Sequence, residues 1–375
     1  MTRIVISANT SWYLFNFRKG TIQALLEKGC DVIAVAPVDP YSEKLRELGC
    51  HFEPLYMDRG STNPIKDMRT TWHYYQIFLR LKPDLVFNFT PKVNIYSTLA
   101  AQFVKAKVVN NIAGLGSLFV SHSLASRIAK LLYRISQPLA DFVFFQNEED
   151  RKLFLDAGIV KQQFTDRLPG SGVDLSRFVV TPAPDDGSVR FILVARMLRE
   201  KGVELYVEAA RQLHQQYPNL EFNLLGFIDE DNPSGISRTQ IEQWQNDGTI
   251  NYLGTTDDVT KVLANQDCVV LPSYYREGVP KSLLEAAAMG KPIVTTDNVG
   301  CRETVDNGLS GFLCTPNDLL SLKNALDKII TMTHAQRKKF GCTGRIKIEN
   351  EFDENMIIKA YLSQLTNLTT PMNWN

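Results

Sequence analysis

Short apolar runs rich in β-branched residues alternate with helix-length segments along this chain, and the alternation occurs twice. In the first half it predicts strands at 3–8, 31–37 and 51–57, with helices at 17–28 and 41–48 between them. Alternating strands and helices form a parallel sheet with helices on both faces. The pattern continues with helices at 65–81 and 148–157 and strands at 84–89, 107–112, 141–146 and 163–169.

The alternation restarts after residues 174–188, a segment rich in proline and aspartate that predicts a linker. At 375 residues the chain is long enough for two domains. We therefore expect an α/β protein with two Rossmann-like domains, at 1–175 and 176–352, and a C-terminal segment at 353–375. The second half predicts strands at 190–195, 220–227 and 249–254 and helices at 202–217, 237–246, 257–265, 319–331, 334–351 and 355–365.

Charge and cysteine content exclude several protein classes. Residues 1–180 hold 22 lysines and arginines against 16 acidic residues, a net charge of +6, and the remainder carries −6. A nucleic-acid-binding protein would be basic overall, so no nucleic acid is expected as a partner of this chain. The six cysteines are scattered without C-x-x-C spacing, which predicts reduced thiols and no zinc site. The first residues predict a strand rather than a signal peptide, and no apolar stretch reaches the ~20 residues that span a bilayer.

Residues 268–296 predict a strand, a loop, a helix and a second strand. Cys268–Leu271 is a short apolar run, 282–289 suits a buried helix that Gly290 ends, and 291–296 is the next strand. The loop at 274–280 therefore lies at the carboxyl end of a strand and the amino end of a helix. In a doubly wound sheet, ligands bind there.

Two carboxylates, Glu277 and Glu285, frame this loop eight positions apart, with Glu285 expected in the first helical turn. Backbone N–H groups at such a turn can face the hydroxyls or phosphates of a ligand. Alternatively, Ser282 and Glu285 form only a capping box and Glu277 is a solvated loop residue. The candidate backbone contacts belong to Gly278, Val279, Lys281 and Ser282, whereas Pro280 has no N–H.

Two basic residues, Arg196 and Lys201, follow the strand predicted at 190–195, and Gly202 then begins the next helix. Cations at this position suit a nucleotide diphosphate, because negative charge builds on the diphosphate as it leaves. The alternative is a pair of solvated charges.

These motifs resemble those of family 4 of the retaining glycosyltransferases, which have the GT-B fold. Glu277 and Glu285 match its E-x7-E motif, and Arg196 to Gly202 match its G-R-x-x-x-x-K-G element, with Ala195 in place of the first glycine. The resemblance implies two Rossmann-like domains that face each other across a cleft. It also implies that a C-terminal helix, at about 353–366, returns to the first domain.

The resemblance also implies roles for these residues. Arg196 and Lys201 would hold the diphosphate of a UDP-sugar, Glu277 the sugar and Glu285 the ribose, with the base near Leu253. Glu277, Arg196 and Lys201 are thus the candidate catalytic residues. The UDP-sugar is a substrate, and no cofactor or metal is expected. Asp229-Glu230-Asp231 spells a D-x-D metal motif, but its place after a strand and before Asn232-Pro233 favours a polar turn.

Further motifs are similar to one branch of this family, which acts on undecaprenyl-diphosphate-linked sugars in O-antigen, capsule and glycoprotein glycan synthesis. The branch implies transfer of a sugar, expected to be an N-acetylhexosamine, to such a lipid-linked acceptor. A nucleotide-sugar 2-epimerase or a non-catalytic nucleotide-sugar-binding subunit remains an alternative. The motifs are Arg59-x-Ser61-x-Asn63-Pro64, Lys92-x-Asn94, Gly114-Leu115-Gly116-Ser117, Asp231-Asn232-Pro233-Ser234 and Val299-Gly300-Cys301-x-Glu303.

A basic amphipathic helix is predicted around residues 124–135. Arg127, Lys130 and Arg134 recur at spacings of three and four between leucines and isoleucines, and residues 85–140 contain no acidic residue. This helix is either an ordinary surface helix or a docking element for an anionic membrane that carries a lipid-linked saccharide acceptor. On the second interpretation the protein is cytoplasmic and peripheral on the inner face of the inner membrane.

Overall fold

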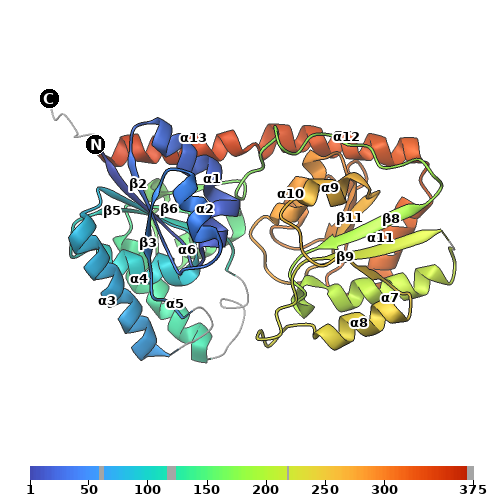
Figure 1. Cartoon of the computed structure of the whole chain (residues 1–375), viewed down its shortest axis with the longest axis horizontal. Coiled ribbons are helices and arrows are strands. Elements are labelled where there is room, and N and C mark those ends of the chain that lie inside the picture. Colours follow the sequence, from blue (N-terminus) through green and yellow to red (C-terminus); the bar gives the residue numbers. More distant parts are fainter. Residues whose placement is uncertain (59–62, 116–123, 218, 370–375) are drawn as a thin grey trace. The chain divides into compact units, whose positions relative to one another are not determined.

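The structure, a computed structural model, describes residues 1–58, 63–115, 124–217 and 219–369. It divides into two compact units. Unit 1 comprises Met1–Ser171 together with Glu354–Asn375, and unit 2 comprises Gly172–Asp353. Each unit contains one parallel β-sheet with helices packed on it, as the alternation predicts (Figure 1).

The sheet of unit 1 has the strand order β3-β2-β1-β4-β5-β6-β7, and all neighbours are parallel. The strand order reverses between β1 and β4. Right-handed crossovers therefore place α1 and α2 on one face and α3 to α6 on the other. The elements are β1 (Arg3–Ser7), α1 (Ser11–Glu27), β2 (Asp31–Ala36), α2 (Tyr41–Glu47), β3 (His51–Pro54), α3 (Pro64–Leu81), β4 (Leu85–Asn88), α4 (Pro91–Ala101), β5 (Lys107–Ile112), α5 (Leu124–Ser136), β6 (Phe142–Phe145), α6 (Glu148–Asp156), β7 (Thr165–Arg167) and α13 (Glu354–Thr369).

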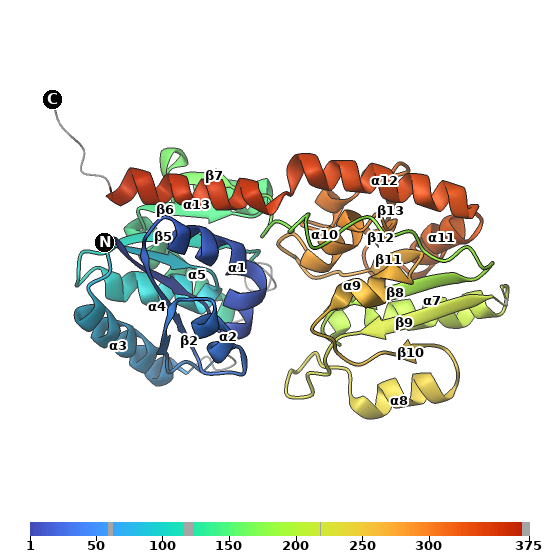
Figure 2. The same cartoon turned by 45° about the horizontal axis from the view of Figure 1, so that its top comes forward.

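Helix α1 begins six residues earlier than the sequence predicts. The Thr10 side chain accepts a hydrogen bond from the N–H of Tyr13 (2.9 Å), so the helix begins at Ser11 rather than at Phe17. Helix α13 packs against α1 and completes the hydrophobic core on that face of the sheet (Figure 2).

The sheet of unit 2 has the order β10-β9-β8-β11-β12-β13 and reverses between β8 and β11. Its last strand, β13, was not predicted, because the run Gly311–Cys314 is short and begins with glycine. That glycine is required, since a Cβ there would lie 2.0 Å from the Ile293 carbonyl oxygen. The elements are β8 (Val189–Val194), η4 (Arg199–Lys201), α7 (Val203–His214), β9 (Leu220–Leu225), α8 (Arg238–Asn246), β10 (Asn251–Tyr252), α9 (Val259–Ala264), β11 (Cys268–Leu271), α10 (Lys281–Ala288), β12 (Ile293–Thr296), η5 (Arg302–Thr304), β13 (Gly311–Cys314), α11 (Leu319–Ile330) and α12 (His334–Glu351).

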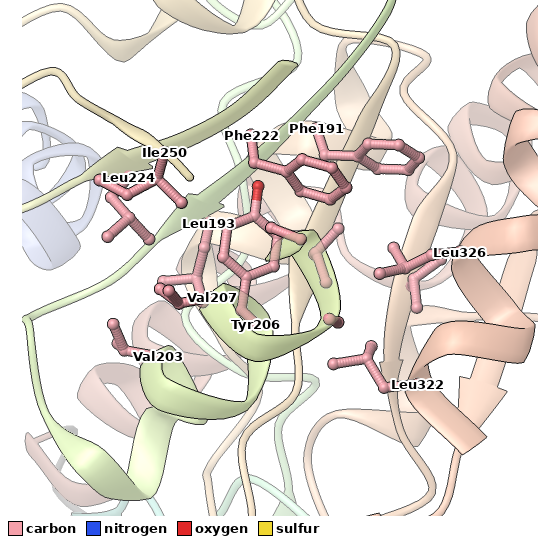
Figure 3. Close-up of a cluster of buried hydrophobic side chains, with 14 of the residues drawn as sticks. Phe191, Leu193, Val203, Tyr206, Val207, Phe222, Leu224, Ile250, Leu322 and Leu326 are labelled. Carbon is pink, nitrogen blue, oxygen red and sulfur yellow. The ribbon is translucent and has the colours of Figure 1, made fainter. Parts of the chain in front are cut away.

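The core of unit 2 fixes β8 and β9 against α7 and α11 (Figure 3). The rings of Phe191 and Phe222 stack with centroids 5.1 Å apart, and Tyr206 of α7 meets Phe222 edge-on at 5.5 Å. Leu322 and Leu326 of α11 close the cluster. This packing holds the carboxyl ends of the strands, where the predicted site residues lie, on a rigid base.

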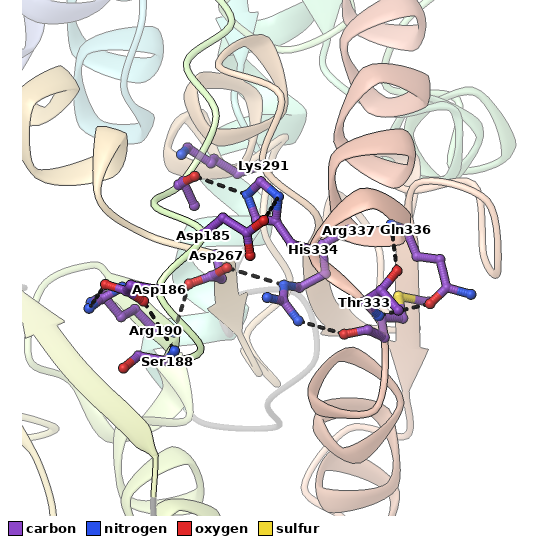
Figure 4. A network of polar contacts seen from close by, with 12 residues as sticks. Asp185, Asp186, Ser188, Arg190, Asp267, Lys291, Thr333, His334, Gln336 and Arg337 are labelled. Atoms are coloured by element: carbon purple, nitrogen blue, oxygen red, sulfur yellow. Dashed lines mark hydrogen bonds and ion pairs between the residues drawn. The ribbon is translucent and has the colours of Figure 1, made fainter.

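A polar network ties the proline-rich segment to unit 2 at the amino ends of β8 and β11 (Figure 4). The buried carboxylate of Asp267 accepts from the Arg337 Nε–H (3.1 Å) and from the Arg190 N–H (3.0 Å). The guanidinium of Arg190 donates two hydrogen bonds to Asp186, at 3.1 and 2.7 Å. The segment predicted as a linker is thus held against unit 2 by ion pairs. The network lies at the sheet edge opposite the candidate site.

Candidate functional site

The predicted donor-binding residues lie at the carboxyl edge of the sheet of unit 2. Arg196 and Lys201 follow β8, and Glu277 follows β11, the strand beside β8. The strand order reverses between these two strands, and ligands bind in the crevice at such a point. Leu253 follows β10 at the same edge.

Lys201 and Glu277 form a direct ion pair across this point. Their side chains are only 17% and 10% exposed, so water screens their attraction weakly. The Ser273 hydroxyl donates to Glu277 Oε1 (2.8 Å), and the Tyr275 ring centroid lies 5.5 Å from Lys201 Nζ. The structure therefore holds a cation and a carboxylate together where the sequence predicts the donor sugar and diphosphate.

Arg196 pairs with a residue that the sequence did not assign to the site. Its Nη1 lies 3.4 Å from Asp229 Oδ2, in the loop after β9. The neighbouring Glu230, the middle residue of the D-x-D motif, accepts a hydrogen bond from the Arg238 N–H (2.9 Å), so Asp229 and Glu230 have separate partners. The signal in the sequence was the position of Asp229, beyond the end of the strand next to β8.

Helix α10 begins at Lys281, after Pro280 as its N-cap, and no side chain caps it. The capping box between Ser282 and Glu285 is therefore wrong, because both residues lie inside the helix. Glu285 lies in the second helical turn rather than the first, as the helix starts one residue earlier than predicted. Burial raises the pKa of Glu285, and Lys281 and Arg177 oppose that rise.

The intrahelical hydrogen bonds of α10 begin with the N–H groups of Leu283 and Leu284, which both donate to the Pro280 carbonyl. Gly278 and Val279 lie in the loop that leads into this helix end, and Ser282 is its second residue. The amino end of a helix carries partial positive charge, which favours an anion at this edge of the sheet.

The last residue of β12 and the loop after it support the loop that contains Glu277, a role that the sequence did not reveal. Asn298 Nδ2 donates to the Tyr275 carbonyl (3.0 Å), and the Thr296 hydroxyl donates to the Ser273 carbonyl. Gly300 has φ +83°, and a Cβ there would lie 1.4 Å from the Gly278 carbonyl oxygen. Only glycine permits this approach of two backbones.

Two exposed apolar side chains complete this edge. Phe227 and Leu253 follow the neighbouring strands β9 and β10. The Gly226 N–H donates to the Gly254 carbonyl (2.8 Å), which ties the two loops together. Exposed apolar side chains beside a charged site suit the flat face of a base.

The basic helix predicted in the first half is α5, and its apolar residues face outward. Leu124, Ile128, Leu131 and Ile135 are exposed, whereas Ser126, Tyr133 and Ser136 are buried. Arg127 and Arg134 are exposed, and Lys130 is partly exposed, along one flank of the apolar stripe. A surface helix normally buries its apolar stripe, whereas the stripe of α5 is exposed among the described residues.

Four residues of the predicted motifs lie outside the described residues, namely Arg59, Ser61, Gly116 and Ser117. Within the described part, Lys92 Nζ donates to the Asp58 carbonyl and to Asp67 Oδ1, both at 2.8 Å.

Among the described residues no cluster of three or more histidines, cysteines or carboxylates is placed to hold a metal ion. No helix in the part of the chain described here has the length and apolar character to cross a bilayer.

Comparison with known proteins gives matches over most of the chain. Residues 180–347 match the family model of glycosyl transferases group 1, and residues 3–147 match the glycosyl transferase 4-like model. The chain is 28% identical to the N,N'-diacetylbacillosaminyl-diphospho-undecaprenol alpha-1,3-N-acetylgalactosaminyltransferase of Campylobacter jejuni, over 96% of this chain and 97% of that one. It is 26% identical to the UDP-Gal:alpha-D-GlcNAc-diphosphoundecaprenol alpha-1,3-galactosyltransferase of Escherichia coli, over 71% of each chain.

Solved structures match over nearly the whole chain. Sucrose-phosphate synthase from Thermosynechococcus elongatus has a TM-score of 0.80 at 18% identity, covering 98% of this chain and 99% of that one. An Anabaena protein crystallised with UDP and glucose has a TM-score of 0.77 at 18% identity, covering 98% and 100%. At this identity the two likenesses concern the fold alone.

Proposed function

This chain belongs to the glycosyltransferases, and from that premise we propose that it transfers a sugar from a UDP-sugar to a saccharide linked to undecaprenyl diphosphate. The transferred sugar is an N-acetylhexosamine, and its anomeric configuration is retained. The observation that carries the proposal is the Lys201–Glu277 ion pair at the point where the strand order of unit 2 reverses. The names of the Campylobacter jejuni and Escherichia coli relatives support the class of acceptor.

Lys201 and Arg196 act on the donor diphosphate. In this structure each cation is paired with a carboxylate, Lys201 with Glu277 and Arg196 with Asp229. A bound diphosphate replaces these carboxylates as the counterion. As the bond between the sugar and UDP breaks, negative charge grows on the leaving phosphate, and the two cations stabilise it. The amino end of α10 adds to the same field.

The remaining residues orient the donor. Glu277, released from Lys201, accepts hydrogen bonds from sugar hydroxyls, and Glu285 accepts them from the ribose. Phe227 and Leu253 contact the base. With two side-chain cations and a helix end at the diphosphate, no metal is needed to balance its charge.

The acceptor is brought to the enzyme at a membrane surface by α5. Its outward Leu124, Ile128 and Leu131 enter the headgroup region, while Arg127, Lys130 and Arg134 meet anionic headgroups or the acceptor diphosphate. On this proposal the protein works on the cytoplasmic face of the membrane.

The test is a transfer assay that pairs several UDP-sugars, UDP-GalNAc first, with undecaprenyl-diphospho-saccharides and with the same saccharides without lipid. We expect turnover that depends on the lipid, persists in EDTA and gives the α-anomer by NMR. Equal turnover of soluble acceptors, or loss of activity in EDTA, would contradict the assignment. Epimer formation without acceptor would indicate a 2-epimerase, and donor binding without turnover would indicate a non-catalytic subunit.

A further inference from the structure

Helix α3 of unit 1 carries an apolar stripe on its outer face. Ile65 (77% exposed), Met68 (72%), Trp72 and Leu79 all point to solvent at spacings of three, four and seven residues. At 100° per residue these four lie opposite the buried stripe of α3. The buried stripe consists of Thr70, Tyr74, Ile77 and Phe78. Helix α3 is therefore apolar on its outer face as well as toward the core.

An aromatic cluster extends this stripe beyond α3. The rings of Trp72 and Tyr75 have centroids 5.2 Å apart, and Tyr75 meets Phe103 in a T-shaped contact at 5.6 Å. Phe103 lies just beyond the end of α4 and is 74% exposed. Three adjoining aromatic side chains, two of them largely exposed, form a surface that water solvates poorly.

Helices α3 and α5 belong to the same helix layer of unit 1. Both helices pack against α4, and all three contribute to one hydrophobic cluster on one face of the sheet. Figure 1 shows α3, α4 and α5 side by side in that layer. Each outer stripe lies on the side of its helix opposite the residues buried against this layer, so both stripes are open to a partner that covers the layer.

We propose that the outer stripe of α3, Ile65, Met68, Trp72 and Leu79 with Phe103, is a second bilayer-binding element that acts together with α5. The inference rests on the proposed membrane docking of α5 and extends it. Tryptophan and tyrosine favour the headgroup level of a bilayer, and the α5 flank of Arg127, Lys130 and Arg134 complements anionic lipid. Two contact lines on either side of α4 fix the orientation of unit 1 on the membrane, which one helix would leave free to rotate.

The test measures binding of the whole protein to vesicles of phosphatidylcholine with and without phosphatidylglycerol. The triple variant Ile65→Ser/Met68→Ser/Leu79→Ser should bind anionic vesicles at least about tenfold more weakly than wild type. The matched control Leu320→Ser/Ile346→Ser removes two exposed apolar side chains of unit 2 and should bind as wild type. All five positions are exposed, so the fold should be unaffected, which circular dichroism checks.

Trp72 is a reporter within the stripe. Brominated lipids should quench a fraction of the wild-type tryptophan fluorescence, and Trp72→Phe should remove that fraction. If the triple variant binds as wild type and Trp72 is not quenched, the inference is wrong. The α5 docking then still stands if Arg127→Glu/Lys130→Glu/Arg134→Glu abolishes binding.

Two other outcomes overturn the inference in different ways. If the wild-type protein binds no vesicle of either composition, both the inference and the proposed docking by α5 fail. If ultracentrifugation shows a dimer without lipid that the triple variant abolishes, the α3 stripe is an interface between two copies of this chain.

Discussion

At the scale of single residues, the ion pair of Lys201 and Glu277 dominates the candidate site. Both side chains are largely buried, so each charge depends on the other for its stability. Their burial also suits them to bind a charged substrate, because electrostatic interactions are strong where water is excluded. Removing Lys201 therefore affects both the chemistry and the stability of unit 2.

We predict that Lys201→Ala lowers kcat by about 10²- to 10³-fold, since a cation at the leaving phosphate is lost. It should also destabilise unit 2 by about 3 kcal/mol, because Glu277 remains buried without its partner. Steady-state kinetics with UDP-GalNAc and urea unfolding measure the two effects. Lys261→Ala, at an exposed lysine of the same unit, should change neither. Turnover of Lys201→Ala equal to that of wild type would remove Lys201 from the mechanism.

At the scale of secondary-structure elements, the turn between α10 and β12 contains a buried lysine. Lys291 is 2% exposed, and its Nζ donates to the Ala264 carbonyl (2.9 Å) at the end of α9. Burial lowers the pKa of Lys291 from 10.5 to about 8, and the charge of Asp267 opposes that change. The folded protein therefore releases this proton more readily than the unfolded chain does.

The stability of the fold depends on pH because the folded and unfolded states bind different numbers of protons at Lys291. Between pH 8 and 10.5 the unfolded chain holds a proton on Lys291 that the folded protein lacks, so the contribution of Lys291 to stability rises with pH. We predict that the free energy of unfolding of wild type relative to Lys291→Met increases by about 3 kcal/mol over this interval. Urea unfolding of both proteins at pH 7, 8, 9 and 10 tests it. A constant difference across these pH values would show that Lys291 keeps its proton when folded.

At the scale of the whole molecule, unit 1 is assembled from two distant parts of the chain. The backbone leaves it after Ser171 and returns at Glu354. Tyr361 of α13 is fully buried, and its ring centroid lies 5.2 Å from that of Phe87 and 5.3 Å from that of Phe144. Its hydroxyl accepts a hydrogen bond from Asn111 Nδ2. The core of unit 1 is therefore complete only when α13 has packed onto it.

We predict that Tyr361→Ala destabilises unit 1 by about 3–5 kcal/mol and leaves unit 2 unchanged, because the cavity lies in one core only. Hydrogen exchange measured by mass spectrometry should show lost protection in peptides of residues 1–171 and not in 172–353. Tyr206→Ala, at a buried tyrosine of unit 2, should give the reverse pattern. Equal loss of protection in both units for Tyr361→Ala would mean that they unfold together.

The sequence by itself determined the α/β class, the family and the strand-end positions of the donor-binding candidates. A short apolar run with β-branched residues that ends in turn residues is typical of a buried parallel strand, and Cys268–Leu271 is one. The predicted resemblance to the glycosyltransferases and their GT-B fold is confirmed by the family models and the solved structures. Local spacing also sufficed for the helix that follows the Glu277 loop, to within one residue at its start.

Only the tertiary structure decided which side of a helix faces the core and which charges meet. Periodicity locates an apolar stripe but cannot say whether the stripe is buried; that of α5 is exposed, and α3 has one on each side. Asp229 and Gly300 likewise gained their roles from neighbouring strands, against Arg196 and Gly278. These contacts depend on sheet order and backbone distance, which are set by packing between segments far apart in the chain.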